Sequence, residues 1–295
     1  MTFDTLLRCA AWSSFLAVAI ACGVARAQDP ALPEAAGPAP CNVDADIARF
    51  DLPLTHLAHR IAAGMPAKIV AIGSSSTGGF GASSPAAAYP SRLEAELRQH
   101  FPGHTLTVVN RGVNNEEVPN MLARFETAVI AERPQLVIWQ FGSNALLHDK
   151  ALDVGLISAG IARLRAIGAD VVVMDPQYAP RVLAKPTHDA VVALIGRVAK
   201  ENKVGVLQRF EMMRHWHEIE GVPFETFLIR DGLHLNDWGY ACVARSLGMA
   251  IAEAASRPTA KVAVTIRATA KVAGPSRRHS SPAHERAIRP ALRAL

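Results

Sequence analysis

The chain has 295 residues, of which 50% are hydrophobic and 19% charged, with 20 Gly, 19 Pro and four Cys. This length suits one medium domain or two small ones. The apolar content excludes wholesale disorder, and the glycine and cysteine usage excludes a collagen-like or disulfide-dense chain. The net charge of +5 is unevenly spread: residues 257–295 contain nine Lys/Arg and one Glu, which leaves −3 for residues 1–256.

The N-terminal residues 1–27 have the pattern of a cleaved secretory signal peptide. Arg8 precedes a mostly apolar stretch from Cys9 to Cys22, and Ala25-Arg26-Ala27 gives small residues at a cleavage site ahead of Gln28. The stretch is shorter than the roughly 20 residues that span a bilayer. We find no later segment that predicts a transmembrane helix. The pattern therefore predicts a periplasmic or secreted protein, with a lipoprotein anchored at Cys22 as the alternative.

Two cysteines, Cys41 and Cys242, remain once the signal peptide is removed. In an oxidising compartment a lone pair favours one disulfide. This bond would join the two ends of a single folded domain, which we place at residues 42–256 after a Pro/Ala-rich linker at 28–41. The alternative is a pair of buried free thiols.

From residue 68 onward, short apolar runs alternate with amphipathic segments. We expect strands at Lys68–Ile72, Leu106–Asn110, Leu136–Phe141, Asp170–Met174 and Gly205–Leu207. We expect helices at Pro90–Phe101, Val118–Glu132, Ile157–Ile167, Ala190–Glu201 and Asp237–Ala255. Near-continuous apolar strands separated by helices are typical of a parallel sheet covered on both faces. The sequence thus predicts an α/β protein, a three-layer α/β/α sandwich of about five parallel strands.

Polar residues follow three of these strands and precede the last helix. They occur in the segments 73–77, 110–115, 142–144 and 231–234. In an open parallel sheet, reactive groups gather beyond the carboxyl ends of the strands. A serine hydroxyl becomes a nucleophile when a histidine removes its proton, and an aspartate can fix the tautomer of that histidine. Ser75, His234 and Asp231 are the candidates for these roles.

An ester carbonyl under attack develops an oxyanion, which needs fixed hydrogen-bond donors. The backbone N–H of Ser75, the backbone N–H near Asn115 and the side-chain amide of Asn144 are the candidates. Four such segments in one order, each at a strand or loop end, favour nucleophilic catalysis over four unrelated turns.

These residues resemble the blocks of the SGNH or GDSL-type hydrolases, over about Lys68 to Ala255. The first block resembles Gly73-Ser74-Ser75-Ser76-Thr77, the third resembles Gly142-Ser143-Asn144, and the last resembles Asp231-Gly232-Leu233-His234. The resemblance implies a flavodoxin-like fold and a metal-free serine esterase with Ser75, His234 and Asp231 as catalytic residues. It also implies an oxyanion hole of Ser75, Asn115 and Asn144. Secreted members often act on acylated polysaccharides, so we expect a short acyl ester, such as an acetyl ester, of a carbohydrate.

Three positions depart from the family pattern. Ser74 replaces the aspartate before the nucleophile, Asn115 replaces an oxyanion glycine, and Ala145 replaces an aspartate after the third-block asparagine. Asn tolerates a left-handed backbone better than most residues, so the main-chain donor at 115 can persist. Two other functions stay open, namely acyl transfer by the same residues and non-catalytic carbohydrate binding on a hydrolase scaffold.

Substrate contacts are predicted at Tyr178 and Arg181, after the fourth strand, and at Trp238, shortly after His234. For Trp238 a platform for a sugar or acyl group and a place in the core are equal alternatives, whereas Trp139 is expected in the core. Gly79 and Gly81 indicate a mobile loop beside Ser75.

The sequence predicts neither a cofactor nor a nucleic-acid partner. The pairs His215/His217 and His56/His59 lack the further ligands of a metal site, and the glycine-rich segment 78–81 lacks the Lys and Ser/Thr of a phosphate loop. The basic segment 257–295 is expected to be disordered, and either to attract anionic surfaces weakly or to be inert.

Overall fold

The structure is a computed structural model and describes residues 41–42 and 46–257. The predicted signal peptide, residues 28–40 of the predicted linker and the basic segment from residue 258 lie outside the described residues.

Five parallel strands form one sheet in the order β2-β1-β3-β4-β5. The strands are β1 (Ala67–Gly73), β2 (Leu106–Gly112), β3 (Leu136–Gln140), β4 (Asp170–Met174) and β5 (Gly205–Leu207). The order reverses between β1 and β3, as in flavodoxin-like sheets. The predicted α/β class with about five parallel strands is confirmed.

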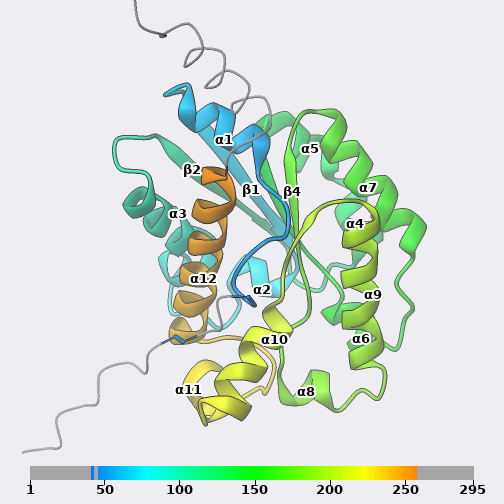
Figure 1. The fold of residues 1–295 in the computed structure, drawn as a ribbon. Helices are drawn as coiled ribbons and strands as arrows, with labels where there is room; N and C mark the ends of the chain where they lie inside the picture. The colour runs from blue at the N-terminus through cyan, green and yellow to red at the C-terminus, as the bar shows by residue number, and fades with distance from the viewer. Residues whose placement is uncertain (1–40, 43–45, 258–295) are drawn as a thin grey trace, which may run out of the picture. The chain divides into compact units, whose positions relative to one another are not determined.

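Helices cover both faces of the sheet (Figure 1). The longer ones are α1 (Thr55–Ala62), α3 (Tyr89–His100), α7 (Val154–Ala166), α9 (His188–Glu201) and α12 (Asp237–Ser256). Shorter α-helices are α2 (Ser75–Gly78), α4 (Val118–Ala123), α5 (Phe125–Ala128), α6 (Ser143–Leu147), α8 (Pro180–Leu183), α10 (Arg209–Arg214) and α11 (Phe224–Phe227). The remaining turns are η1 (Pro85–Ala87), η2 (Ile130–Glu132) and the π-helical η3 (His215–Ile219).

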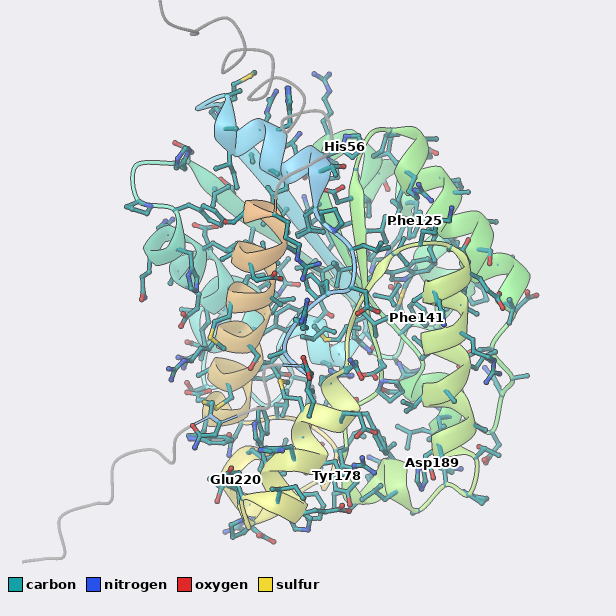
Figure 2. The ribbon with its side chains drawn as sticks, viewed as in Figure 1. His56, Phe125, Phe141, Tyr178, Asp189 and Glu220 are labelled. Carbon is teal, nitrogen blue, oxygen red and sulfur yellow. A yellow bond between two sulfur atoms is a disulfide. The ribbon has the colours of Figure 1, made fainter. Side chains whose placement is uncertain are left out.

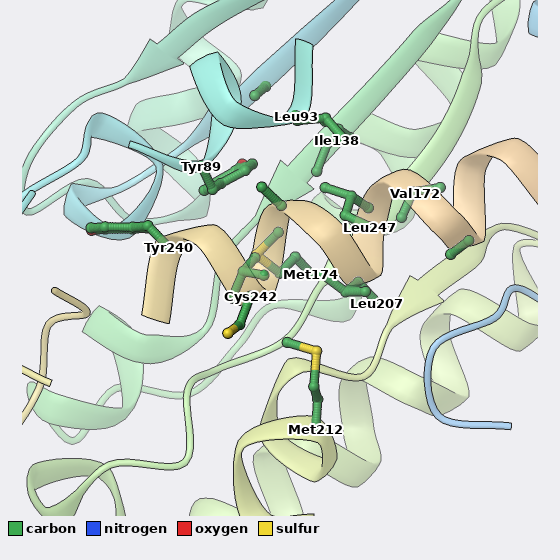
Figure 3. Close-up of a cluster of buried hydrophobic side chains, with 14 of the residues drawn as sticks. Tyr89, Leu93, Ile138, Val172, Met174, Leu207, Met212, Tyr240, Cys242 and Leu247 are labelled. Atoms are coloured by element: carbon green, nitrogen blue, oxygen red, sulfur yellow. The ribbon is translucent and has the colours of Figure 1, made fainter. Parts of the chain in front are cut away.

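Alternating side chains of the strands divide the core into two layers. In β1, Ile69 packs with one buried cluster that includes residues of α1, α3 and α12, and Val70 packs with another that includes residues of α4, α5, α7 and α9. Successive side chains of a strand point to opposite faces, so a fully apolar strand buries both of its faces. Figure 3 shows the first layer, where Leu93 of α3 and Leu247 of α12 lie close to Ile138 and Val172 of the sheet.

The predicted single helix at Val118–Glu132 is wrong. The structure has α4, α5 and η2 in its place, and the first break falls at Arg124. The guanidinium of Arg124 donates to the carboxylate of Glu116 and to the backbone oxygen of Arg111. Arg111 lies near the end of β2 and Glu116 in the loop after it, so these are tertiary contacts that helical periodicity does not reveal.

A disulfide joins Cys41 to Cys242 of α12, across 201 residues. The predicted pairing is thus present in the structure, and the alternative of free thiols is not. Among the residues that the structure describes, no helix is long and apolar enough to cross a membrane.

Candidate active site

The carboxyl ends of β1, β2 and β3 place three polar loops along one edge of the sheet. The turns after β1, β2 and β3 lead into α2, α4 and α6, and the segment Asp231–His234 precedes α12. This edge is the one along which α8, α10 and α11 lie in Figure 1. The four segments singled out from the sequence therefore meet at one site.

The turn from β1 into α2 presents Ser75, and Gln140 at the end of β3 holds this turn in place. The Oε1 atom of Gln140 accepts hydrogen bonds from the backbone N–H of Ser74 at 2.9 Å, from the Ser74 hydroxyl at 3.1 Å and from the Thr77 hydroxyl at 3.2 Å. A Cβ atom on Gly73 would lie 2.7 Å from this oxygen, too close for any side chain. Gln140 thus provides contacts in a loop that lacks the family's aspartate at position 74.

Ser75, His234 and Asp231 form a continuous hydrogen-bonded relay. The Ser75 Oγ lies 2.8 Å from His234 Nε2, and His234 Nδ1 lies 2.5 Å from Asp231 Oδ2. Because the carboxylate can only accept, the proton of the neutral ring sits on Nδ1, which leaves Nε2 free to take the serine proton. The structure therefore brings together the three residues in the arrangement that activates a serine hydroxyl.

The carboxylate of Asp231 accepts further hydrogen bonds from its own turn. Its Oδ1 atom receives the backbone N–H groups of Leu233 at 2.9 Å and His234 at 3.0 Å. Partial burial acts to raise the pKa of Asp231, but the bonds from His234 and Leu233 outweigh it and hold this pKa below its usual 3.8. Asp231 is thus kept ionised beside the imidazole.

The candidate oxyanion donors lie next to Ser75. Asn115 has a left-handed backbone with φ of 64°, the conformation that its amide side chain tolerates better than most. Asn144 donates one Nδ2 hydrogen to the backbone oxygen of Glu116 at 2.9 Å. A primary amide has two such hydrogens, so one remains for a ligand.

The oxyanion loop between β2 and α4 is held by an ion pair. Arg124 donates to both carboxylate oxygens of Glu116, at 2.6 to 2.9 Å, and to the backbone oxygen of Arg111 at 2.7 Å. The side chains of Arg124 and Glu116 are only 20% and 14% exposed. This pair fixes Glu116, and through its carbonyl also Asn144. Neither residue was singled out from the sequence, because the bond joins two separate elements.

A pocket of about 260 Å³ opens over this site. Ser75, Asn115, Asn144 and His234 line it. The other lining residues are Phe80, Asn114, Leu147, His148, Arg181 and Leu233. The ring of Phe80 lies 4.5 Å from the ring of His234 and remains 48% exposed. Phe80 was missed from the sequence, although the flanking Gly79 and Gly81 mark its loop.

The loop around Phe80 is tied to the domain at several atoms. The backbone oxygen of Phe80 accepts a hydrogen bond from the Tyr240 hydroxyl at 2.8 Å. The backbone N–H of Phe80 donates to the backbone oxygen of Ser75 at 3.0 Å. Gly79 and Gly81 both have positive φ, and a Cβ on Gly81 would lie 2.5 Å from the backbone oxygen of Leu235. The mobility predicted for this loop stays a prediction.

Of the three predicted substrate contacts, only Arg181 lines the pocket. Tyr178 lies at the same end of the sheet, the end away from His56 in Figure 2. It is only 8% exposed, and its hydroxyl donates to the carboxylate of Glu218 at 2.5 Å. Its ring stacks on Phe224 with 6.0 Å between centroids. Tyr178 is therefore a packing residue, since its strand-end position did not reveal which way its side chain points.

Trp238 is not among the residues that line the pocket. Its ring packs against Trp216 at 5.3 Å and against Phe227 at 6.3 Å. Trp238 is half-buried against the core, so of the two alternatives given for it these contacts favour packing. Trp139 is fully buried, as expected.

The histidines considered as metal ligands have other surroundings. His217 Nδ1 donates to the backbone oxygen of Val222 at 3.0 Å, and its ring stacks on Phe224 at 3.9 Å. Within the described part of the chain, no group of three or more His, Cys, Asp or Glu is arranged to hold a metal ion.

A family model for the non-GDSL lipase-like family matches residues 40–257. The chain belongs to this family. The match agrees with the resemblance to SGNH-type hydrolases, and the family's description fits the first block, where Ser74 stands in place of the aspartate of the GDSL pattern. No curated protein sequence matches the chain.

Several solved structures of esterases and of one hydrolase have the same fold. A two-domain esterase active on acetylated mannans superposes with a TM-score of 0.59 at 18% identity, covering 72% of this chain and 58% of its own. The chain thus spans little more than half of that enzyme. A variant of an acetyl xylan esterase from Geobacillus stearothermophilus gives 0.54 at 20% identity, covering 63% of this chain and 94% of its own. An alpha/beta hydrolase enzyme from the metagenome of Lake Arreo, Spain, superposes with a TM-score of 0.52 at 19% identity, covering 63% of this chain and 96% of its own.

Proposed function

We propose that the protein is a serine esterase that hydrolyses short acyl esters. The observation that supports this most is the relay from Ser75 Oγ through the His234 ring to Asp231, at 2.8 and 2.5 Å, on the wall of a 260 Å³ pocket. A pocket of this size suits a small acyl group such as acetyl.

In the first half of the reaction, His234 Nε2 takes the Ser75 proton while Oγ attacks the ester carbonyl carbon. The carbonyl oxygen becomes an oxyanion held by the N–H groups of Ser75 and Asn115 and by the second Nδ2 hydrogen of Asn144. The intermediate then expels the alcohol, which receives the proton from His234. An acyl group stays on Ser75.

In the second half, water replaces the alcohol. His234 removes a proton from the water as its oxygen attacks the acyl carbon, and the same three donors hold the new oxyanion. Collapse of this intermediate breaks the bond to Ser75, whose Oγ recovers the proton from His234. The products are the carboxylic acid and the free serine.

We also propose an acylated carbohydrate as the natural substrate and export as the destination. Esterases with this fold, including those named for acetylated mannans and acetyl xylan, support the substrate class. The signal-like residues 1–27 and the disulfide between Cys41 and Cys242 support export, because disulfides persist in oxidising compartments.

The proposal is tested with purified protein by release of p-nitrophenol from acetyl and butyryl esters. We expect turnover by the natural sequence and loss of nearly all of it in Ser75→Ala, since no other group in the relay can form the acyl-enzyme. Ser76→Ala is a matched control, because Ser76 is a neighbouring buried serine that does not line the pocket. Equal rates for Ser75→Ala and the natural sequence would refute the proposal.

A further inference from the structure

The pocket is lined by basic side chains and by no acidic ones. Neither Asp nor Glu is among its lining residues, whereas Arg181 and the rings of His148 and His234 are. His234 is paired with Asp231. His148 Nδ1 lies 2.8 Å from the Glu117 carboxylate, which Lys150 also contacts at 2.9 Å. These two histidines therefore have acidic partners just outside the pocket.

Arg181 has no such partner. Within the described residues its guanidinium makes no ion pair or hydrogen bond, while its backbone N–H donates to the carbonyl oxygen of Gly232 at 3.1 Å. The stem of its side chain runs close to the same glycine, with Cγ 4.0 Å from the position of a Cβ there. The turn that presents His234 thus also anchors Arg181, which fixes where its charge enters the pocket.

An arginine guanidinium carries five N–H donors and matches a carboxylate with two parallel hydrogen bonds. A pocket wall with one unpaired guanidinium attracts an anionic ligand, and because no Asp or Glu lines the pocket, no carboxylate on the wall repels that ligand. The arginine is exposed at the rim, so a substrate can reach it without unfolding any element.

We infer that Arg181 makes this esterase selective for esters that bear a carboxylate near the scissile bond. The inference rests on the proposed esterase function and names the substrate class of the same site. The carboxylate can belong to the acyl group, as in a dicarboxylic half-ester, or to the alcohol, as in an acetylated uronic acid. In either case Arg181 binds the carboxylate and takes no part in proton transfer.

Two matched pairs of esters distinguish these sources. For the acyl side, the mono-4-nitrophenyl ester of adipic acid is compared with 4-nitrophenyl hexanoate. For the alcohol side, 4-acetoxybenzoate is compared with its methyl ester. The intrinsic reactivity of each ester is the same for every variant, so the change between variants in the ratio of kcat/KM for the anionic ester to that for the neutral ester isolates the selectivity. The variants are Arg181→Gln and, as a control that removes the same charge from the exposed face of α9, Arg197→Gln.

We expect Arg181→Gln to lower this ratio by about tenfold or more in at least one pair, because a charge-assisted bidentate contact is lost, and Arg197→Gln to leave it unchanged. The pair that responds identifies the side of the ester that bears the carboxylate. An unchanged ratio in both pairs, with the neutral esters still hydrolysed, would overturn the inference and leave the esterase function standing. Neutral esters hydrolysed equally by Ser75→Ala would instead overturn the function itself.

A second measurement covers the case in which Arg181→Gln loses all turnover. Added NaCl screens exposed charges, so for the natural sequence the anionic-to-neutral ratio should fall as salt rises. A ratio that salt does not change in either pair would contradict a role for Arg181 in selectivity.

Discussion

At the scale of single residues, the ionisation of Asp231 couples the chemistry of the site to the stability of the domain. Three hydrogen bonds from Leu233 and His234 reach its carboxylate. They hold its pKa below the usual 3.8 despite partial burial. The ionised form is therefore favoured more in the folded protein than in the unfolded chain. This stabilisation is complete above about pH 4 and is lost as the pH falls through the lowered pKa.

We predict that Asp231→Asn lowers kcat for a neutral ester roughly ten-thousandfold, because an amide allows the wrong imidazole tautomer. The variant should also unfold more easily at pH 7, by about 1–2 kcal/mol. This difference should shrink towards pH 3, which urea unfolding at the two pH values measures. Glu253→Gln is the control, since the bond from Arg257, just after α12, also lowers the pKa of the Glu253 carboxylate. A kcat for Asp231→Asn equal to that of the control would contradict the role of Asp231.

Four residues could be singled out from the sequence because short local patterns contain them. Ser75, Asn144, Asp231 and His234 each follow a strand or precede a helix, so their positions in space follow from the topology. The direction of a side chain does not follow in the same way. Tyr178 and Arg181 are three residues apart after β4, yet one packs on Phe224 and the other lines the pocket.

At the scale of elements, the site depends on contacts between loops that separate strands present. Gln140 at the end of β3 accepts three hydrogen bonds from the turn that begins α2. It is fully buried, and a buried glutamine in an apolar strand gives no sequence signal of such a role. Gln135, just before β3, accepts the backbone N–H of Lys68 at 2.8 Å at the opposite end of the same strands.

We predict that Gln140→Leu lowers the free energy of unfolding by about 1–3 kcal/mol and lowers kcat at least roughly tenfold, because the nucleophile turn loses its acceptor. Gln135→Leu is the matched control and should lose stability while its kcat stays near that of the natural sequence. Urea unfolding and ester turnover of both variants are the measurements. Equal kcat values for the two would show that Gln140 only stabilises the fold.

The pair of Arg124 and Glu116 holds the oxyanion loop in a similar way. We predict that Arg124→Ala lowers kcat by roughly ten- to a hundredfold, towards the cost of one oxyanion donor, with little change in KM. Arg124→Lys, which keeps the charge but not the two parallel bonds, should fall between. Arg98→Ala removes a pair on the exposed face of α3, with Glu94, and should have little effect. The measurement is the steady-state kinetics of these three variants. A change in Arg124→Ala that is confined to KM would argue against a role for Arg124 in positioning the oxyanion loop.

The sheet, by contrast, was largely predictable. Strands β1, β3 and β4 have buried side chains on both faces, so each produces a continuous apolar run such as Val171-Val172-Val173. The interruption at Arg124 was not predictable, because the partner of this residue lies on another loop. Local patterns therefore located the strands and the catalytic candidates, whereas the contacts that hold them together required the tertiary structure.

At the scale of the whole molecule, the disulfide between Cys41 and Cys242 closes a segment of 201 residues that includes the entire sheet. Closing so long a loop restricts the unfolded chain, an effect of roughly 2–5 kcal/mol in proteins. We predict that a reductant lowers the unfolding midpoint of the natural sequence but not that of a Cys41→Ala, Cys242→Ala double variant. Two titratable thiols in the unreduced, denatured protein would contradict the bond.

Taken together, the molecule places one hydroxyl, one imidazole and one carboxylate from distant parts of the chain on a common pocket wall. The most direct test of their joint action is reaction with a fluorophosphonate, followed by mass spectrometry of the modified peptide. We expect a single adduct on Ser75 that is absent in Ser75→Ala and forms far more slowly in His234→Ala. An adduct elsewhere, or labelling of Ser75→Ala at the natural rate, would contradict this joint action.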